Sequence, residues 1–173
     1  HITNPTGELA IAAALGFTLE ILADFSGYTD IARGLSYLLG FDTSENFRNP
    51  YLSLTPTEFW NRWHITLSTW LRDYIFFPVR RALLRAKSLP DWIVQSAPPV
   101  VTMLISGLWH GVGWTYVVWG LLYGVSIAFY QLIGLRGEWK PKGLVKTVLA
   151  WIVMFALTLL AFFERARPMC AST

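Results

Sequence analysis

The sequence predicts an all-α, polytopic membrane protein, and its composition is the first reason. Of the 173 residues, 54% are apolar and 14% are charged, whereas a soluble domain carries about 25% charged residues. The stretches 9–23, 97–134 and 144–163 are apolar enough to form helices in a bilayer. Glycine and proline interrupt the chain between and within them, so broken and interfacial helices are expected. This composition excludes a soluble enzyme, a disordered segment and a disulfide-rich module.

The first apolar stretch, residues 9–23, is long enough for a helix but shorter than the roughly 20 residues that span a bilayer. Ser26 and Gly27 follow, and helical apolar spacing resumes at Ile31. Serine and glycine at this point favour a helix break. We therefore expect a broken pair of helices in this part of the chain.

A polar loop over residues 42–55 ends in a strong helix-start signal. Thr55 is placed to cap the helix, Pro56 to occupy its first position and Glu58 to close a capping box. The helix predicted over residues 56–74 is amphipathic, with tryptophans on its apolar side. It is expected to lie along the membrane interface or to pack into the protein at headgroup depth.

Residues 61–87 have the charge bias of a cytoplasmic face. Six basic residues stand against one acidic residue, which is the bias that orients membrane proteins. The basic residues are Arg62, Arg72, Arg80, Arg81, Arg85 and Lys87, and the acidic one is Asp73. Membrane topology therefore explains the formal net charge of +3 without nucleic-acid binding.

Residues 97–134 are almost free of charge but too long for one straight membrane helix. At about 1.5 Å per residue, they would extend to nearly twice the thickness of a bilayer core. Glycines at positions 107, 111 and 113 predict a break within residues 107–113 and a path that returns across the membrane. Residues 144–163 supply the clearest spanning helix of the chain.

His110 lies at this predicted break and is the strongest candidate for chemistry. An ionisable side chain is costly to place in lipid, so it is expected to face a cavity and to have a function there. A neutral imidazole can accept a proton from a hydroxyl group, and burial disfavours the charged form. The alternative is a buried histidine that only holds two helices together. His64 is weaker evidence, because an interfacial side chain explains it equally well.

Other kinds of site find no support in the sequence. It contains no His or Cys cluster with metal-ligand spacing, no Walker-type loop and no Gly-x-Ser-x-Gly elbow. We therefore expect no bound metal. Glu20, Asp24 and Asp30 can be read as a proton relay, but the favoured interpretation is a helix cap at Asp30 and pairing or protonation of the others.

Three segments occur in a distinctive order and spacing: DFSGYTDIARGLSYLLGF (24–41), NFRNPYLSLTPTEFWNRWHITLSTWLRDYIFFP (46–78) and SGLWHGVGWTYVVWGLLYG (106–124). Together they resemble the membrane-bound O-acyltransferase (MBOAT) family, in particular its bacterial branch of alginate O-acetylation and teichoic acid D-alanylation. The resemblance implies a funnel of transmembrane helices with histidines at its narrow bottom. Residues 1–173 are then expected to be one membrane domain, the C-terminal catalytic part, with the N-terminal helices missing.

The resemblance also assigns roles to residues. His110 matches the family's invariant histidine, which implies a general base, and His64 matches the second histidine of this branch. Apart from the resemblance, helical spacing places Asn61 and Ser68 on turns next to His64, where they are candidates to hold it. Asn61, Ser68 and Trp109 are expected to contact the substrate. No cofactor is expected to be bound, because acyl-CoA or an acyl-carrier thioester enters as a substrate.

The resulting hypothesis is transfer of an acyl group, with acetyl expected, to a hydroxyl of a cell-envelope polysaccharide or of an intermediary protein. The implied location is the bacterial inner membrane, crossed several times. Implied partners are the lipid bilayer, an acyl donor or carrier protein on the cytoplasmic side, and a periplasmic acyltransferase partner or glycan acceptor. Arg72–Lys87 can attract an acidic carrier protein, although topology is the favoured explanation of these charges.

Two rival functions remain open at this point, and so does the acceptor. A proton-coupled transporter or channel subunit would use His110 with intramembrane carboxylates such as Glu20 or Asp24. A nonenzymatic scaffold would use the tryptophan helix to bind a partner. Many alginate-type members carry a Pro-Leu-Gly-Gly-Asn-Arg-like stretch after the RDY motif, whereas this chain reads FFPVRRALLRAKSLPDW (76–92). The resemblance therefore leaves the acceptor polymer open.

Overall fold

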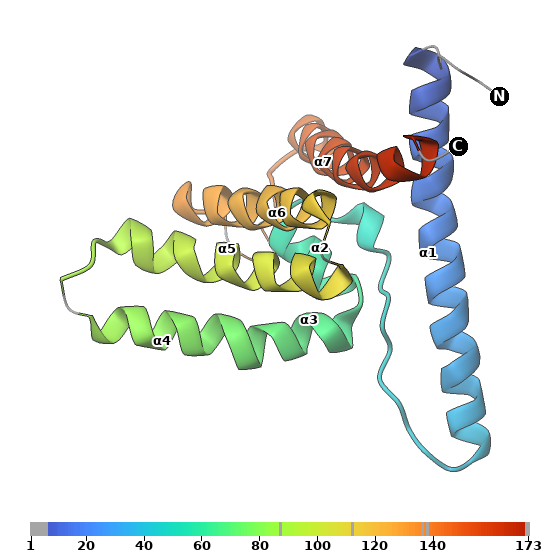
Figure 1. The fold of residues 1–173 in the computed structure, drawn as a ribbon, viewed down its shortest axis with the longest axis horizontal. Helices are drawn as coiled ribbons and strands as arrows, with labels where there is room; N and C mark the ends of the chain where they lie inside the picture. Colours follow the sequence, from blue (N-terminus) through green and yellow to red (C-terminus); the bar gives the residue numbers. More distant parts are fainter. Residues whose placement is uncertain (1–6, 87, 112, 136, 138, 172–173) are drawn as a thin grey trace. The chain divides into compact units, whose positions relative to one another are not determined.

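The computed structural model describes residues 7–86, 88–111, 113–135, 137 and 139–171, without the side chains of residues 10 and 162–171 (Figure 1). Every regular element among these residues is helical, which confirms the all-α class. In chain order the elements are α1 (Gly7–Leu38), η1 (Pro50–Leu52), α2 (Pro56–Arg62), α3 (Ile65–Leu71), η2 (Arg72–Phe76), α4 (Phe77–Arg85), α5 (Asp91–His110), α6 (Trp114–Leu132) and α7 (Leu144–Ala171).

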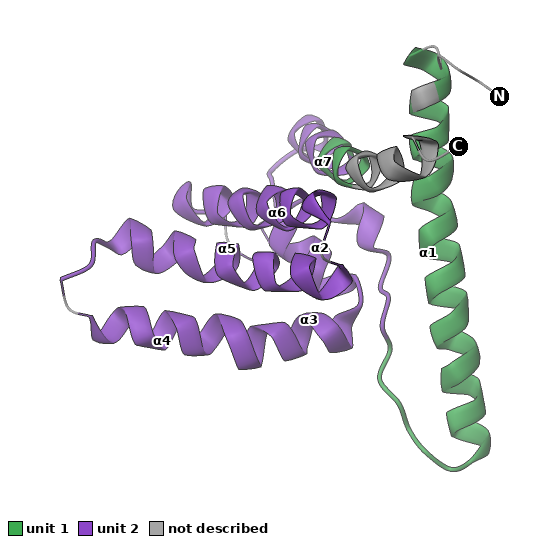
Figure 2. Ribbon diagram, viewed as in Figure 1, with its two compact units in different colours: residues 1–45, 156–173 green, residues 46–155 purple. Residues whose placement is uncertain are grey.

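The chain separates into two compact units (Figure 2). Unit 1 comprises His1–Glu45 and Ala156–Thr173, and unit 2 comprises Asn46–Phe155. Unit 2 contains both candidate histidines and the three residues expected to contact substrate. The candidate site is therefore described within unit 2 alone.

Helix α1 of unit 1 runs through Ser26 and Gly27 without a break, so the predicted pair of helices was wrong. The Ser26 hydroxyl donates a hydrogen bond back to the Ala23 carbonyl, and the Thr29 hydroxyl donates to the Ser26 carbonyl at 2.9 Å. Polar side chains are thus satisfied inside the helix. One interior glycine costs only about 1 kcal/mol, which is too little to interrupt 32 helical residues. Asp30 lies inside this helix and does not cap one.

Within the described residues, four helices are long and apolar enough to cross a membrane: Gly7–Leu38, Asp91–His110, Trp114–Leu132 and Leu144–Ala161. The first is longer than the apolar run in the sequence suggests, because α1 extends well beyond residue 23. The predicted spanning helix over residues 144–163 is confirmed by α7. The protein is therefore a multi-pass membrane protein.

Helices α5 and α6 form an antiparallel hairpin that breaks where the glycines predict. Helix α5 ends at His110 and α6 begins at Trp114, and the two lie side by side in unit 2 (Figure 1). A Cβ atom on Gly107 would collide with the Tyr116 carbonyl oxygen, and one on Gly120 with the Met103 carbonyl oxygen. Small residues at these positions let the two backbones approach closely, as membrane helix pairs require.

The amphipathic segment is not one helix over residues 56–74, as the sequence predicted. It breaks at Trp63 and His64, where α2 ends and α3 begins. His64 has φ 43° and ψ 59°, the left-handed conformation, so the helical hydrogen-bond ladder cannot continue through it. The π-helical turn η2 then joins α3 to α4 ahead of Pro78, whose missing N–H would weaken a regular helix.

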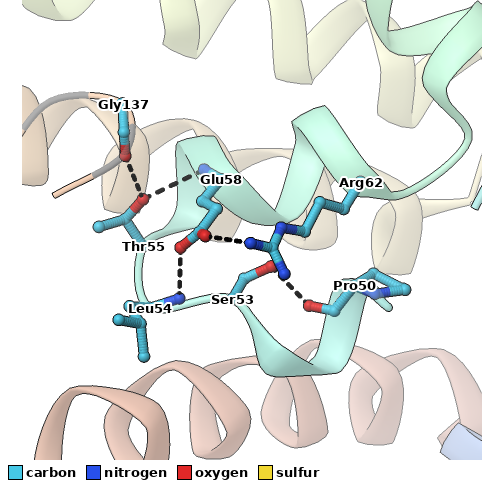
Figure 3. A network of polar contacts seen from close by, with 7 residues as sticks. All are labelled: Pro50, Ser53, Leu54, Thr55, Glu58, Arg62 and Gly137. Atoms are coloured by element: carbon cyan, nitrogen blue, oxygen red, sulfur yellow. Dashed lines mark hydrogen bonds and ion pairs between the residues drawn. The ribbon is translucent and has the colours of Figure 1, made fainter. Parts of the chain in front are cut away.

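The start of α2 forms the predicted cap, held in a polar network (Figure 3). The Thr55 hydroxyl accepts a hydrogen bond from the Glu58 N–H and donates one to the Gly137 carbonyl, both at 3.1 Å. The Glu58 carboxylate accepts from the Leu54 N–H, one residue earlier than a standard capping box. It also pairs with Arg62 at 2.6 Å. This network ties α2 to the segment between α6 and α7.

The basic segment predicted to face the cytoplasm lies largely on α4, where Arg80, Arg81 and Arg85 are exposed. Lys87, the predicted end of that segment, lies outside the described residues. Trp60 and Trp63 pack into unit 2, whereas Trp70 is 51% exposed. Trp60 and Trp63 therefore anchor the C-terminal end of α2 in unit 2.

Candidate active site

His64 lies at the junction of α2 and α3, half-buried, with its ring stacked on Phe47 at 6.5 Å between centroids. Phe47 also meets Trp63 edge to face at 5.1 Å. Desolvation by burial lowers the pKa of the His64 imidazole below its ordinary value. The neutral form of this ring is therefore favoured at neutral pH.

Asn46 fixes the backbone on the C-terminal side of His64. Its main-chain carbonyl accepts a hydrogen bond from the Ile65 N–H at 3.0 Å. Its side-chain oxygen accepts from the Thr66 N–H at 3.1 Å and from the Thr66 hydroxyl at 2.7 Å. On the other side, the Ser68 hydroxyl donates to the Trp63 carbonyl at 2.9 Å. These bonds stabilise the left-handed turn that presents the imidazole.

His110 is the last residue of α5, and it is half-buried among aromatic rings. Its imidazole meets Trp119 edge to face at 5.0 Å and Trp109 at 4.9 Å, and it stacks on Tyr116 at 6.4 Å. Trp119 is only 2% exposed, so its indole is held by the surrounding side chains and restricts the movement of the imidazole. The fold thus fixes the position of His110 at the end of the α5–α6 hairpin.

A row of aromatic contacts connects the two histidines through the interior of unit 2. Each neighbouring pair of rings has centroids between 5.0 and 6.5 Å apart. From His110 the row passes through Trp119, Trp60, Phe59, Trp63 and Phe47 to His64. Helix α2 therefore positions both imidazoles relative to one aromatic core.

Two cavities lie beside α3. One, of about 180 Å³, is lined by residues of α2, α3, η2, α5 and α6, namely Thr57, Trp60, Asn61, Ser68, Leu71, Arg72, Phe76, Pro99, Thr102, Met103, Ile127 and Gln131. The other, of about 310 Å³, is mostly apolar and is lined by Leu67, Trp70, Leu71, Ile105, Ser106 and Trp109. Leu71 borders both. The three residues expected to contact substrate all line a cavity: Asn61 and Ser68 the smaller one and Trp109 the larger.

Two of the glycines near His110, Gly107 and Gly111, pack closely against Tyr116. A Cβ atom on Gly107 would meet the Tyr116 main chain, and one on Gly111 would come within 2.5 Å of the Tyr116 ring. Protein atoms already occupy the space beside both glycines. They therefore serve helix packing around His110.

Sequence reasoning missed several residues of this region. Trp119 and Tyr116 lie within a turn or two of the break and follow ordinary apolar periodicity, so nothing in their spacing marks them as neighbours of His110. Asn46 and Thr66 are separated by 20 residues and meet beside the left-handed residue His64, where α2 gives way to α3. Among the described residues, no group of three His, Cys, Asp or Glu side chains is placed to bind a metal ion.

Comparison of the sequence with known proteins shows the family of this chain. The profile of the membrane-bound O-acyltransferase family, MBOAT, matches residues 7–164. The chain therefore belongs to the membrane-bound O-acyltransferase family.

Several curated relatives are similar along most of the chain. The chain is 38% identical over 161 residues to the protein named "Probable alginate O-acetylase AlgI" of Pseudomonas aeruginosa, covering 93% of this chain and 29% of that protein. It is 34% identical over 155 residues to the peptidoglycan O-acetyltransferase of Helicobacter pylori, covering 89% and 28%. It is 31% identical over 152 residues to the teichoic acid D-alanyltransferase of Bacillus subtilis, covering 86% and 38%. The chain thus spans about a third of the length of these relatives.

Proposed function

We propose that this chain forms the histidine-bearing part of an enzyme that transfers an acyl group to a hydroxyl of a cell-envelope polysaccharide or of an intermediary protein. Membership of the acyltransferase family carries the proposal. The names of three groups of relatives agree on acyl transfer, to alginate, peptidoglycan or teichoic acid. Two of these names specify acetyl and one specifies D-alanyl, and we favour acetyl because the acetylases are more similar in sequence.

His110 is the proposed general base. Its imidazole would take the proton of the acceptor hydroxyl while that oxygen attacks the carbonyl carbon of the acyl thioester. The thiolate then leaves and recovers the proton from the imidazolium, so the step consumes no other reactant. General-base assistance contributes about 10²- to 10⁴-fold to such a reaction. The packing of His110 against Trp119 supports this role, because a base must be held in one orientation.

The two cavities are the proposed sites of the substrates. Asn61 and Ser68 line the smaller cavity, and Trp109, the residue before His110, lines the larger one. Within the described residues, the buried Thr57 Oγ1 and Trp60 Nε1 atoms beside the smaller cavity have no hydrogen-bond partner. These two atoms are able to form a hydrogen bond to water or to a polar group of a substrate in the cavity.

The proposed location is the bacterial inner membrane, with the acyl donor on the cytoplasmic side. The donor is a thioester of coenzyme A or of a carrier protein, and it is consumed as a substrate. A periplasmic acyltransferase or the glycan itself would receive the acyl group. The exposed arginines of α4 support a cytoplasmic position for that helix.

The proposal is tested by reconstituting the full-length protein in lipid vesicles with an isotope-labelled acyl thioester and a hydroxylated glycan. An alkali-labile ester on the glycan is the expected product. Proton flux driven by a pH gradient, without ester formation under any donor, would instead favour the transporter.

A further inference from the structure

We infer that Asn46 and Thr66 are positioning residues that hold the His64 imidazole with its proton on Nδ1. In this tautomer Nε2 carries the lone pair, so it can accept a hydrogen bond from an O–H group and cannot donate one to an oxyanion. The inference rests on the proposed function for its substrate. The tautomer itself follows from hydrogen-bond geometry within unit 2.

One atom of the Asn46 side-chain amide faces Thr66 of α3, and its neighbour shows which atom it is. That atom lies 3.1 Å from the Thr66 backbone nitrogen, and a backbone N–H can only donate. An amide NH₂ group at this position would place two donors against each other. The atom must therefore be the oxygen Oδ1, whichever way the amide is otherwise assigned.

The contact with Asn46 also locates the single proton of the Thr66 hydroxyl. Thr66 Oγ1 lies 2.7 Å from the same Asn46 Oδ1. Two oxygens approach this closely only when a proton lies between them, and Asn46 Oδ1 carries none. The Thr66 hydroxyl therefore donates to Asn46 and directs its lone pairs elsewhere.

The Nδ1 atom of His64 lies 3.5 Å from Thr66 Oγ1. Because the Thr66 proton is engaged with Asn46, Thr66 Oγ1 can only accept from the imidazole. A neutral His64 is then protonated on Nδ1 and leaves Nε2 as the basic nitrogen. A contact of 3.5 Å is long for a hydrogen bond, and such bonds at active sites often shorten when substrate binds.

The backbone of this region supports the same arrangement. Asn46 binds the N–H groups of Ile65 and Thr66, the two residues that follow His64. The Arg48 N–H donates to the Arg62 carbonyl at 3.0 Å on the other side of the turn. The left-handed conformation of His64 is therefore braced on both sides by the segment that carries Asn46. Movement of that segment would turn the imidazole and change its hydrogen bonding.

The role assigned to His64 differs from that of a residue that donates a hydrogen bond to the oxyanion of the intermediate. Neutral His64 with Nε2 as an acceptor can align a substrate hydroxyl group. Stabilising the oxyanion of the tetrahedral intermediate would require a proton on Nε2.

Nitrogen NMR of the full-length protein labelled with ¹⁵N-histidine tests the tautomer directly. The signals of His64 are identified by their loss in His64→Gln. We expect a protonated Nδ1 and an unprotonated Nε2 near neutral pH, and a shift toward the other tautomer in Thr66→Val. Thr66→Ser, which keeps the hydroxyl, should retain the Nδ1–H form, as should the matched control Thr69→Val. A protonated Nε2 in the unsubstituted protein overturns the inference, even if Thr66→Val cannot be purified.

Kinetics with the thioester donor provide the second readout. Thr66→Val should lower kcat by about 10-fold, the upper range for one neutral hydrogen bond, with KM nearly unchanged, and Thr66→Ser should restore it. Equal kcat values for Thr66→Val and Thr69→Val would contradict the positioning role. Full acyl transfer by His64→Gln would refute any role of His64. A protonated Nε2 with intact acyl transfer would refute only the tautomer and leave the proposed function standing.

Discussion

The His110 imidazole meets the Trp119 indole edge to face, with ring centroids 5.0 Å apart and ring planes at 87°. Trp119 belongs to α6 and His110 is the last residue of α5, so this contact joins the two helices of the hairpin at the proposed base. An edge-to-face aromatic pair contributes about 0.5–1.5 kcal/mol beyond its buried area. The same indole contacts Trp60 of α2 at 5.7 Å. Trp119 thus couples the position of His110 to the helix that precedes His64.

Gly120→Ala should destabilise the α5–α6 hairpin. The added methyl group would collide with the Met103 carbonyl of the facing helix, and overpacking of this kind costs about 1–3 kcal/mol. Thermal unfolding of the detergent-solubilised full-length protein measures the loss. Gly16→Ala is the control, because nothing lies within 4 Å of its Cβ position in α1. Equal melting temperatures for the two variants would show that the helices do not approach this closely.

Stability should fall in weak acid in a way that depends on His64. Burial lowers the pKa of this imidazole in the folded protein, so the unfolded chain takes up its proton at higher pH than the folded one. The stabilisation is present above the ordinary histidine pKa and is lost as the pH falls through the lowered value. Unfolding midpoints measured from neutral to mildly acidic pH should therefore decline less in His64→Gln. Identical declines in both proteins would assign the effect to other groups.

Asn61→Ala should weaken binding of the acyl donor. Asn61 lines the smaller cavity, and loss of one hydrogen bond to substrate corresponds to about a 2- to 10-fold rise in KM. Steady-state kinetics with the thioester donor give KM and kcat separately. Thr69→Ala, on α3 but outside the lining of that cavity, is the control. A large fall in kcat with unchanged KM would place Asn61 in the chemical step instead.

Helix α4 should face the cytoplasm. Arg80, Arg81 and Arg85 are exposed on it, and this basic bias sets the orientation of membrane segments. Arg81→Cys, introduced after replacement of Cys170 and any other cysteine of the full-length protein, should resist impermeant thiol reagents in intact cells. It should react after the inner membrane is opened. Labelling in intact cells would invert the proposed topology.

The sequence predicted those features that depend on local chemistry. Thr55 caps α2 because a threonine before Pro56 and Glu58 has few other local arrangements available. The break beside His110 follows from clustered glycines in an apolar run too long for one helix. The resemblance to the family marks both histidines as candidates, and their roles stay predictions.

Features that depend on distant contacts could not be predicted. The turn at His64 needs Asn46 to bind Ile65 and Thr66, and periodicity over residues 56–74 gives no sign of it. The opposite error occurred at Ser26 and Gly27, where local signals favoured a break that α1 does not have. There the serine bonds back to its own helix, and intrinsic propensity is only a weak prior.

Replacement of His110 tests whether this residue is the base for acyl transfer. Full-length His110→Ala, inserted in the membrane at normal abundance, is compared with the unsubstituted protein for ester formed per minute from the labelled thioester. We expect a loss of at least about 10²-fold, the lower bound for general-base assistance, with donor binding retained. Ester formation by His110→Ala at a rate close to that of the unsubstituted protein would contradict it.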